Sequence, residues 1–212
     1  LNAGPLTTLT DVQFFVSGAS QFTETGNTAT YSSKGLVTSG GSSTYTYTTN
    51  LFTASDVGTL LDLSSIQSID ASFARQSNDY NHQEIAASNR ATLDLSGVTR
   101  ITGPQASNDW LRFSINDSGT QLKLDALRST QAEAGTIRFD LNAGARLDLP
   151  ALQSIDSTEF HLDGGSTVNA GALAAISDAS FELKGSSRLT LQDQQQPVSI
   201  ANTHFDLSDG SS

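Results

Sequence analysis

The sequence predicts an all-β fold, a parallel β-solenoid of about eight coils with a repeat of roughly 21 residues. Three observations predict it. Leu-x-Leu and Phe-x-Leu pieces recur along the chain, Gly and Asx residues recur at fixed offsets between them, and apolar residues alternate with polar ones. The chain of 212 residues is long enough to bury one sizeable core.

The repeat is clearest when two distant segments are compared without gaps. Residues 1–16 align with residues 168–183, and the match extends to Gly18 and Gly185. Five positions coincide in chemistry: Leu6 with Leu173, Leu9 with Ile176, Asp11 with Asp178, Phe14 with Phe181 and Val16 with Leu183. Such a unit cannot bury its apolar face alone, so it is expected to stack on copies of itself.

Each coil is expected to have three short sides. Leu-x-Leu and Phe-x-Leu have the periodicity of a strand with one buried face. The Leu-x-x-Ile piece between them is too short for a stable helix and suits a bent third side. The first piece recurs at Leu61-Asp62-Leu63, Leu93-Asp94-Leu95, Leu122-Lys123-Leu124, Leu147-Asp148-Leu149 and Leu189-Thr190-Leu191.

The residues between the sides have the chemistry of turns. Asp178 and Asn202 each follow an Ile by two positions and precede a Phe by three, and Asx residues tolerate the left-handed backbone conformation. A second corner is marked by glycines, where a positive φ is expected. These are Gly18, Gly119, Gly144, Gly165, Gly185 and Gly210.

Stacking at about 4.8 Å per coil places like residues above one another. We therefore expect an internal ladder of Phe139, Phe160, Phe181 and Phe205. A leucine-rich repeat is the main alternative, but its return side is helical, whereas here the return side is a Phe-x-Leu strand. A helical repeat is disfavoured by the abundance of Thr, Ser, Gly and Asp.

The coil pattern runs to both ends, so residues 1–212 are interpreted as a single solenoid segment of a larger protein, with open coils that continue into flanking repeats. Loop insertions are expected in the N-terminal half, at about residues 24–57, 74–90 and 103–110. The four tyrosines and the single tryptophan lie in or beside these insertions.

With these repeats, the chain resembles the right-handed parallel β-helix of bacterial secreted and cell-surface proteins, including large adhesins and autotransporter passengers. The resemblance covers nearly the whole chain and is weakest in residues 24–57. It implies a secreted or cell-surface location. It implies no particular activity, because the same scaffold carries polysaccharide lyases, epimerases, phage tailspikes and inert stalks.

Composition excludes several classes of partner and site. The net charge of −11 argues against a nucleic-acid backbone or an anionic membrane surface, since both reward clustered Lys and Arg. The absence of Cys excludes disulfides, zinc–thiolate sites and thiol nucleophiles. No apolar run approaches the roughly 18 residues of a membrane helix, so no membrane insertion is expected.

Aromatic residues beside acidic and amide residues are the best candidates for a ligand site. Aromatic faces stack on sugar rings, and carboxylates and amides bind hydroxyls. The candidates are Tyr45, Tyr47, Asp79, Tyr80, His82, Glu84 and Trp110. The alternative is that these loops fold back and pack their aromatic side chains against the solenoid.

A cofactor is not expected, although calcium is considered because Asp62, Asp94 and Asp148 share the outward position of Leu-x-Leu. Lys123 interrupts that column, so solvated Asp side chains that discourage edge stacking are the better interpretation. Catalysis is not expected, since no catalytic motif is present. Any catalytic cluster would have to gather Arg75, Asp79, His82, Glu84, Arg90 and Arg112 from neighbouring coils.

The sequence thus predicts a structural or adhesive, non-enzymatic segment of a large extracellular bacterial surface protein. Its partner would be an extracellular glycan or a host or cell-surface molecule. The alternative is a β-helix that binds or cleaves carbohydrate with its aromatic insertion loops. His161 and His204 are interpreted as surface residues.

Overall fold

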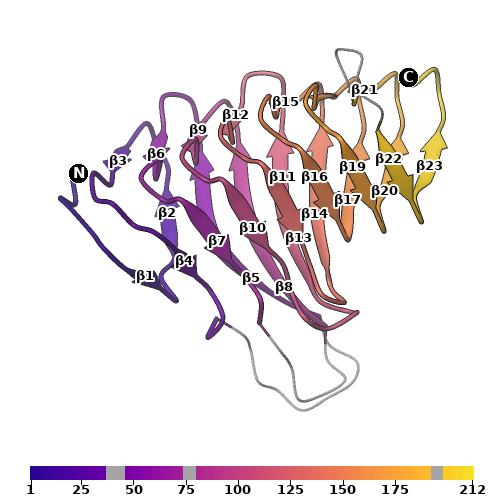
Figure 1. Ribbon diagram of the computed structural model, residues 1–212. Coiled ribbons are helices and arrows are strands. Elements are labelled where there is room, and N and C mark those ends of the chain that lie inside the picture. The colour runs from indigo at the N-terminus through magenta and orange to yellow at the C-terminus, as the bar shows by residue number, and fades with distance from the viewer. Residues whose placement is uncertain (37–45, 74–79, 192–197) are drawn as a thin grey trace.

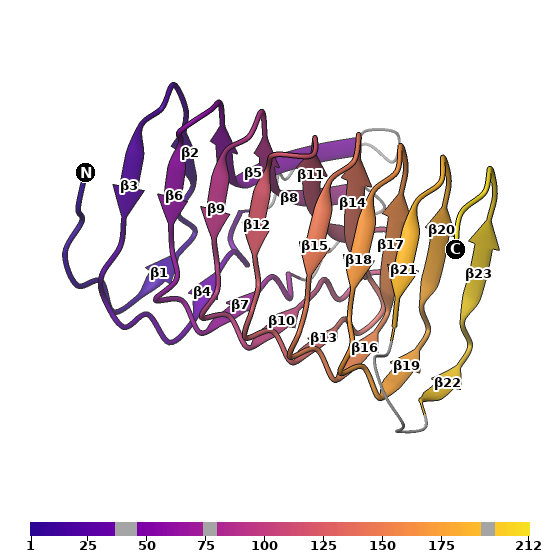
Figure 2. The same ribbon diagram turned by 90° about the horizontal axis from the view of Figure 1, so that it is seen from above.

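In the computed structural model the chain winds into a rod of stacked coils (Figure 1). The structure describes residues 1–36, 46–73, 80–191 and 198–212. The strands of these residues pair in parallel and form the three faces of a β-helix with eight coils, which confirms the predicted fold class (Figure 2). Among the described residues no helix is long and apolar enough to cross a membrane.

The first face is one sheet whose strands follow one another coil by coil. Every strand has two or three residues, with its middle or first residue turned inward. The strands are β1 (Leu9–Thr10), β4 (Tyr31–Ser32), β7 (Ser68–Asp70), β10 (Arg100–Thr102), β13 (Ser129–Gln131), β16 (Ser154–Asp156), β19 (Ala175–Ser177) and β22 (Ser199–Ala201).

The second face is also one sheet in coil order, and it contains the longest strands. It carries the Phe-x-Leu pieces of the repeat. The strands are β2 (Phe14–Val16), β5 (Thr46–Ser55), β8 (Tyr80–Ser88), β11 (Trp110–Asn116), β14 (Thr136–Asn142), β17 (Thr158–Leu162), β20 (Ser180–Leu183) and β23 (His204–Leu207).

The third face carries the Leu-x-Leu pieces and is divided into two sheets. One sheet contains β3 (Gln21–Thr23), β6 (Leu60–Asp62), β9 (Thr92–Asp94) and β12 (Gln121–Lys123). The other contains β15 (Arg146–Asp148), β18 (Thr167–Asn169) and β21 (Arg188–Thr190). Asn2 extends the first of these sheets by a parallel bridge to Thr23.

The core is a set of ladders formed by like residues in successive coils. The predicted phenylalanine ladder is confirmed, with ring centroids 4.9 Å, 5.4 Å and 4.8 Å apart in successive steps. Phe113 extends it by one further step of 4.9 Å. Alternation places every second residue of a strand inside, so burial of this ladder fixes the register of the second face.

The predicted corner conformations are largely confirmed. Asp178 and Asn202 both have φ of 48°, and Gly185 has φ of 60°. The prediction was wrong for Gly119, because the left-handed residue of that corner is Asp117, with φ of 78°. The Asp117 carboxylate accepts hydrogen bonds from the Gly119 amide and the Thr120 hydroxyl, which stabilises this Asx turn without a glycine at its left-handed position.

The coils taper along the rod. Measured between paired residues of the second face, coil length is 38 residues from Phe14 to Phe52 and falls through 33 and 28 to 26 between Phe113 and Phe139. It reaches 21 residues between Phe139 and Phe160. Over the same range the strands of the second face shorten from 10 residues in β5 to 4 in β20. All the extra residues lie at the corner between the first and second faces.

The predicted bounds of the insertions therefore need correction. The segment 24–57 contains β4 and β5, and the segment 74–90 contains β8, all of which are solenoid strands. Tyr31 is fully buried in the core, where its hydroxyl donates a hydrogen bond to the Val12 carbonyl. The alternation of apolar and polar residues continues through these long strands, but their distance from the flanking repeat pieces varies from coil to coil.

Candidate functional site

The predicted site residues come mainly from one end of two adjacent strands. Tyr80, His82 and Glu84 lie in β8, and Trp110 begins β11. Parallel pairing places Trp110 opposite His82. Tyr47 lies in β5, whereas Tyr45 and Asp79 fall outside the described residues. The structure thus brings four of the seven candidates together on the outer surface of the second face.

The Trp110 indole is enclosed on both sides. The His82 ring stacks on it with centroids 3.7 Å apart, and the Arg138 guanidinium lies 5.3 Å from the ring centre. His82 is only 8% exposed. Burial, together with the positive charge of Arg112, lowers the pKa of His82 to about 4. A neutral imidazole and a cation therefore cover the faces that a sugar ring would need.

A strip of charged side chains continues from this stack along the second face. Arg112 binds Glu84 at 2.9 Å and lies 3.8 Å from the Asp140 carboxylate. Arg138 donates a second ionic hydrogen bond to Asp140. We call the residues Glu84, Arg112, Arg138, Asp140, Glu159, His161, Glu182 and Lys184 the lateral strip.

The far part of the lateral strip is centred on His161. Its Nε2 atom lies 3.2 Å from Glu159 and its Nδ1 atom 3.2 Å from Glu182. Lys184 also pairs with Glu182. The bond from His161 lowers the pKa of Glu159, and the bond from Lys184 lowers that of Glu182. Each carboxylate of the strip thus has a cationic or imidazole partner.

Sequence reasoning missed Arg138, Asp140, Glu159 and Glu182 as members of this surface. A usable signal was present. Arg112, Arg138 and Glu159 directly precede ladder phenylalanines, and their register pairs place them in one column. Asp140, His161 and Glu182 directly follow ladder phenylalanines and form the next column.

A hollow of about 350 Å³ adjoins the Trp110 stack. Its lining includes Tyr80, His82, Trp110, Thr136 and Glu159. Tyr80 is 40% exposed and is the most accessible described aromatic side chain of this lining. The hollow offers an aromatic edge, a hydroxyl and a carboxylate, which suits a polar, uncharged ligand better than an anion.

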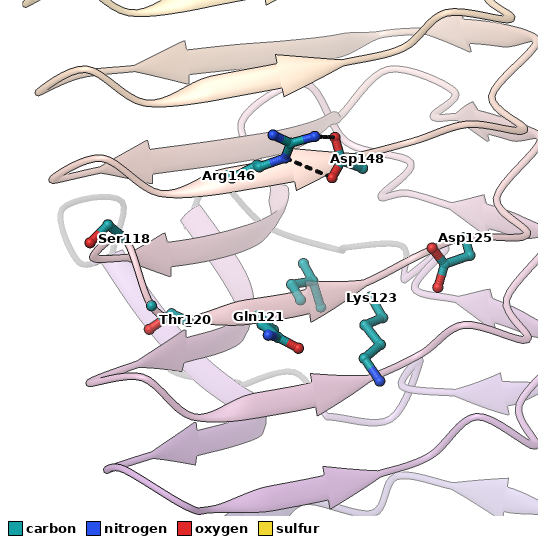
Figure 3. A pocket seen from close by; sticks show the side chains of 9 residues that line it. Ser118, Thr120, Gln121, Lys123, Asp125, Arg146 and Asp148 are labelled. Carbon is teal, nitrogen blue, oxygen red and sulfur yellow. Dashed lines mark hydrogen bonds and ion pairs between the residues drawn. The ribbon is translucent and has the colours of Figure 1, made fainter.

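A second hollow of about 310 Å³ lies on the third face where its two sheets meet (Figure 3). Its lining includes Lys123, Asp125, Arg146 and Asp148. β12 and β15 border it and are not hydrogen-bonded to each other, which separates the two sheets of this face. Arg146 binds Asp148 through two hydrogen bonds of 2.8 and 3.0 Å, and these bonds lower the pKa of Asp148.

The outward Asp column of the third face is paired with neighbouring groups. Asp94 accepts a hydrogen bond of 2.8 Å from Lys123 of the next coil. Asp62 accepts bonds from the amide and hydroxyl of Ser64. Within the described chain no three acidic or histidine side chains form a metal-binding group.

The residues that a catalytic cluster would require are only partly gathered. Glu84 and Arg112 form an ion pair, and Arg112 lowers the pKa of nearby His82. Arg90 lies in the turn after β8, where its amide bonds to Thr120, at the far end of the strand from His82. Arg75 and Asp79 lie outside the described residues.

Ion pairing within the lateral strip neutralises the groups that acid–base chemistry would use. The arrangement is therefore suited to rigidifying the outer surface of the second face and to presenting a fixed pattern of polar groups. No protein-family model, no curated protein and no solved structure matches this chain.

Proposed function

We propose that this chain is a structural and adhesive β-solenoid segment of a large extracellular bacterial surface protein and that it has no enzymatic activity. The observation that supports this most directly is the continuity of the rod. The phenylalanine ladder runs through five successive coils, from Phe113 to Phe205, without interruption. Its outer charges are largely paired with one another.

Both features suit a load-bearing spacer. Each coil contacts only its neighbours, so length can grow without a change in design and stability is nearly additive along the rod. Paired surface charges hold side chains in place without requiring a ligand. The lateral strip then provides a regular polar surface of the kind that can contact a glycan or a protein on another cell.

Surface labelling tests the location. An antibody raised against the folded chain should label intact, unpermeabilised cells of the source organism, and external protease should remove the label. Labelling that requires permeabilisation would contradict the proposal. Beads coated with the folded chain should adhere to cells or extracellular glycans, whereas beads coated with urea-unfolded chain should not.

Carbohydrate binding at the hollow beside Trp110 is a second candidate. It is favoured by the 40% exposure of Tyr80 above a lining that contains Glu159. On a glycan array, Tyr80→Ala should abolish binding, and Trp110→Ala should weaken it by displacing His82 and Arg138. Phe15→Ala is the matched control, since Phe15 is an exposed aromatic residue on a different coil.

The same candidate includes polysaccharide cleavage. Incubation of the bound glycan with the folded chain would then release shorter, unsaturated oligosaccharides, and Glu159→Gln would stop the release. Equal array signals for the parent chain and Tyr80→Ala would sink both the binding and the cleavage forms of this candidate.

A further inference from the structure

The C-terminal coil exposes residues that are buried in every complete coil before it. In β22 and β23, Ile200 is 53% exposed, Phe205 41% and Leu207 50%. Their partners one coil earlier, Ile176, Phe181 and Leu183, are 2%, 0% and 1% exposed. These side chains and the free edges of their strands continue the interface that joins every pair of coils inside the rod.

The covering element must repeat the geometry of that interface. It needs inward apolar residues with five positions between the first and second faces, as from Ile200 to Phe205, and two more to Leu207. The first coil of the same chain has this spacing in Leu9, Phe14 and Val16. It is short even though the coil next to it is the longest of the rod.

The corners of the two terminal coils also match. Asp11 of the first coil and Asn202 of the last have φ of 54° and 48°. Gly18 and Gly210 have φ of 65° and 77° at the following corner. Strands of the two coils could therefore run parallel over both faces without a change of backbone conformation.

The first coil has apolar side chains available at its outer side. Phe14 and Val16 point inward but are only half-buried, and they pack against the core from its end. Leu9 differs, since it is 4% exposed and already largely enclosed. The contact would therefore depend on the second face more than on the first.

The chain ends do not obstruct such a contact. The Ser212 amide donates to the Ser187 carbonyl, and the Ser212 carbonyl accepts from the Leu189 amide, so Ser212 begins a new strand position on the third face beside β21. Asn2 occupies a later position of the same side in the first coil. The two ends would lie beside each other at one corner and leave the stacked strands clear.

We propose that the C-terminal coil of one copy stacks on the N-terminal coil of a second copy, head to tail, with Phe205 on Phe14 and Leu207 on Val16. Because the two surfaces differ, the contact is heterologous and generates open chains of copies instead of closed dimers. The inference concerns the ends of the rod and is independent of the extracellular role proposed above.

Sedimentation velocity tests this with three variants. The parent chain should form chains of copies whose mean mass rises with concentration up to about 200 μM, a range that detects weak protein contacts. Ile200→Lys/Leu207→Lys blocks the C-terminal surface, and Val16→Lys blocks the N-terminal one. Each should be monomeric alone, and an equimolar mixture should form one-to-one complexes. Asp206→Lys is the matched control, because it adds positive charge on the outward side of β23 and should leave association unchanged.

Far-UV circular dichroism and thermal melts establish that each variant is folded. A parent chain that stays monomeric throughout, a closed dimer, or association that survives both lysine variants would overturn the proposal. A direct fusion of two copies distinguishes a further source of the covering coil. If the fusion gains stability while separate copies never associate, the C-terminal surface is covered by following coils of one chain, and the second-copy proposal fails.

Discussion

Phe139 and Phe160 stack with their ring centroids 4.9 Å apart and their planes 12° from parallel. Their strands are paired residue for residue, so the separation is that of neighbouring strands. The same relation holds at each step of the ladder, and both residues are almost completely buried. The stability of the middle of the rod therefore depends on side chains that each contact the coils above and below.

Replacing one ring inside the ladder should destabilise the rod strongly. Phe160→Ala removes a buried aromatic side chain and leaves a cavity, which costs about 3–5 kcal/mol of unfolding free energy. Phe205→Ala is the control and should cost less than half of this, because that ring is 41% exposed. Urea unfolding followed by circular dichroism measures both, and equal losses would contradict the ladder's role.

Two glycine corners should respond differently to the same substitution. At Gly18 an added Cβ meets no atom within 4 Å, so Gly18→Ala should cost only the left-handed strain of about 1 kcal/mol. At Gly185 the Cβ would lie 2.9 Å from the Gly164 amide nitrogen. Gly185→Ala should therefore cost clearly more. Thermal melts of the two variants test this, and a larger loss at Gly18 would refute the stacked-corner geometry.

His82 should make stability depend on pH in mildly acidic solution. Its pKa is about 4 in the folded chain against 6.5 in the unfolded chain. The unfolded chain therefore takes up a proton first, and stability that is complete above pH 6.5 falls as the pH approaches 4. The full loss is of order 3 kcal/mol, from about 1.4 kcal/mol per pKa unit.

His82→Gln should remove this component. Urea midpoints measured between pH 7 and 4 should fall less steeply for His82→Gln than for the parent chain. His204→Gln is the matched control, since His204 is exposed on the last coil. Parallel pH profiles for the parent chain and His82→Gln would show that the imidazole is not held neutral.

The ion pair between Glu84 and Arg112 should matter more than an exposed pair of the same type. The Glu84 side chain is 15% exposed, so Arg112→Met leaves a mostly buried carboxylate without its 2.9 Å partner. A loss of about 1–3 kcal/mol is expected. Arg146→Met is the control, because Arg146 and Asp148 are 65% and 46% exposed, and it should cost under about 1 kcal/mol. Urea titrations in low and high salt provide the measurement.

The sequence predicted the inside of the rod better than its outside. A residue such as Phe181 must pack on Phe160 and Phe205, so the same residue type recurs at the coil spacing and is visible in the sequence. Outward residues need only suit their neighbours. Arg112, Arg138 and Glu159 occupy one column with different chemistry, and no repeat reveals them.

The candidate site was predicted only in part for the same reason. His82 and Trp110 were proposed as ligand residues because of their residue types, and the structure does bring them together. Their mutual stacking depends on the register between β8 and β11, which the sequence does not specify where coil length changes from coil to coil. The division of the third face between Lys123 and Arg146 likewise leaves no mark on the Leu-x-Leu pattern.

That division predicts a local difference in hydrogen exchange. In neighbouring coils the Leu95 amide donates to the Lys123 carbonyl at 3.0 Å, and the Leu149 amide donates to the Asn169 carbonyl at 2.8 Å. The equivalent Leu124 amide faces the hollow between β12 and β15, which are not paired within the described chain. Backbone amides that lack such a bond exchange by small local openings, so Leu124 should exchange about 10- to 100-fold faster than Leu95 and Leu149.

Amide exchange followed by nuclear magnetic resonance resolves these three residues individually. The Arg146 amide, on the other side of the hollow, should also exchange faster than that of Thr167, which donates to the Ala145 carbonyl at 2.9 Å. Equal protection at all these positions would mean that β12 and β15 pair in solution and that the third face is continuous. Rapid exchange confined to Leu124 and Arg146 would instead mark this step as the place where the rod opens first, since one of its three inter-coil sheets is interrupted there.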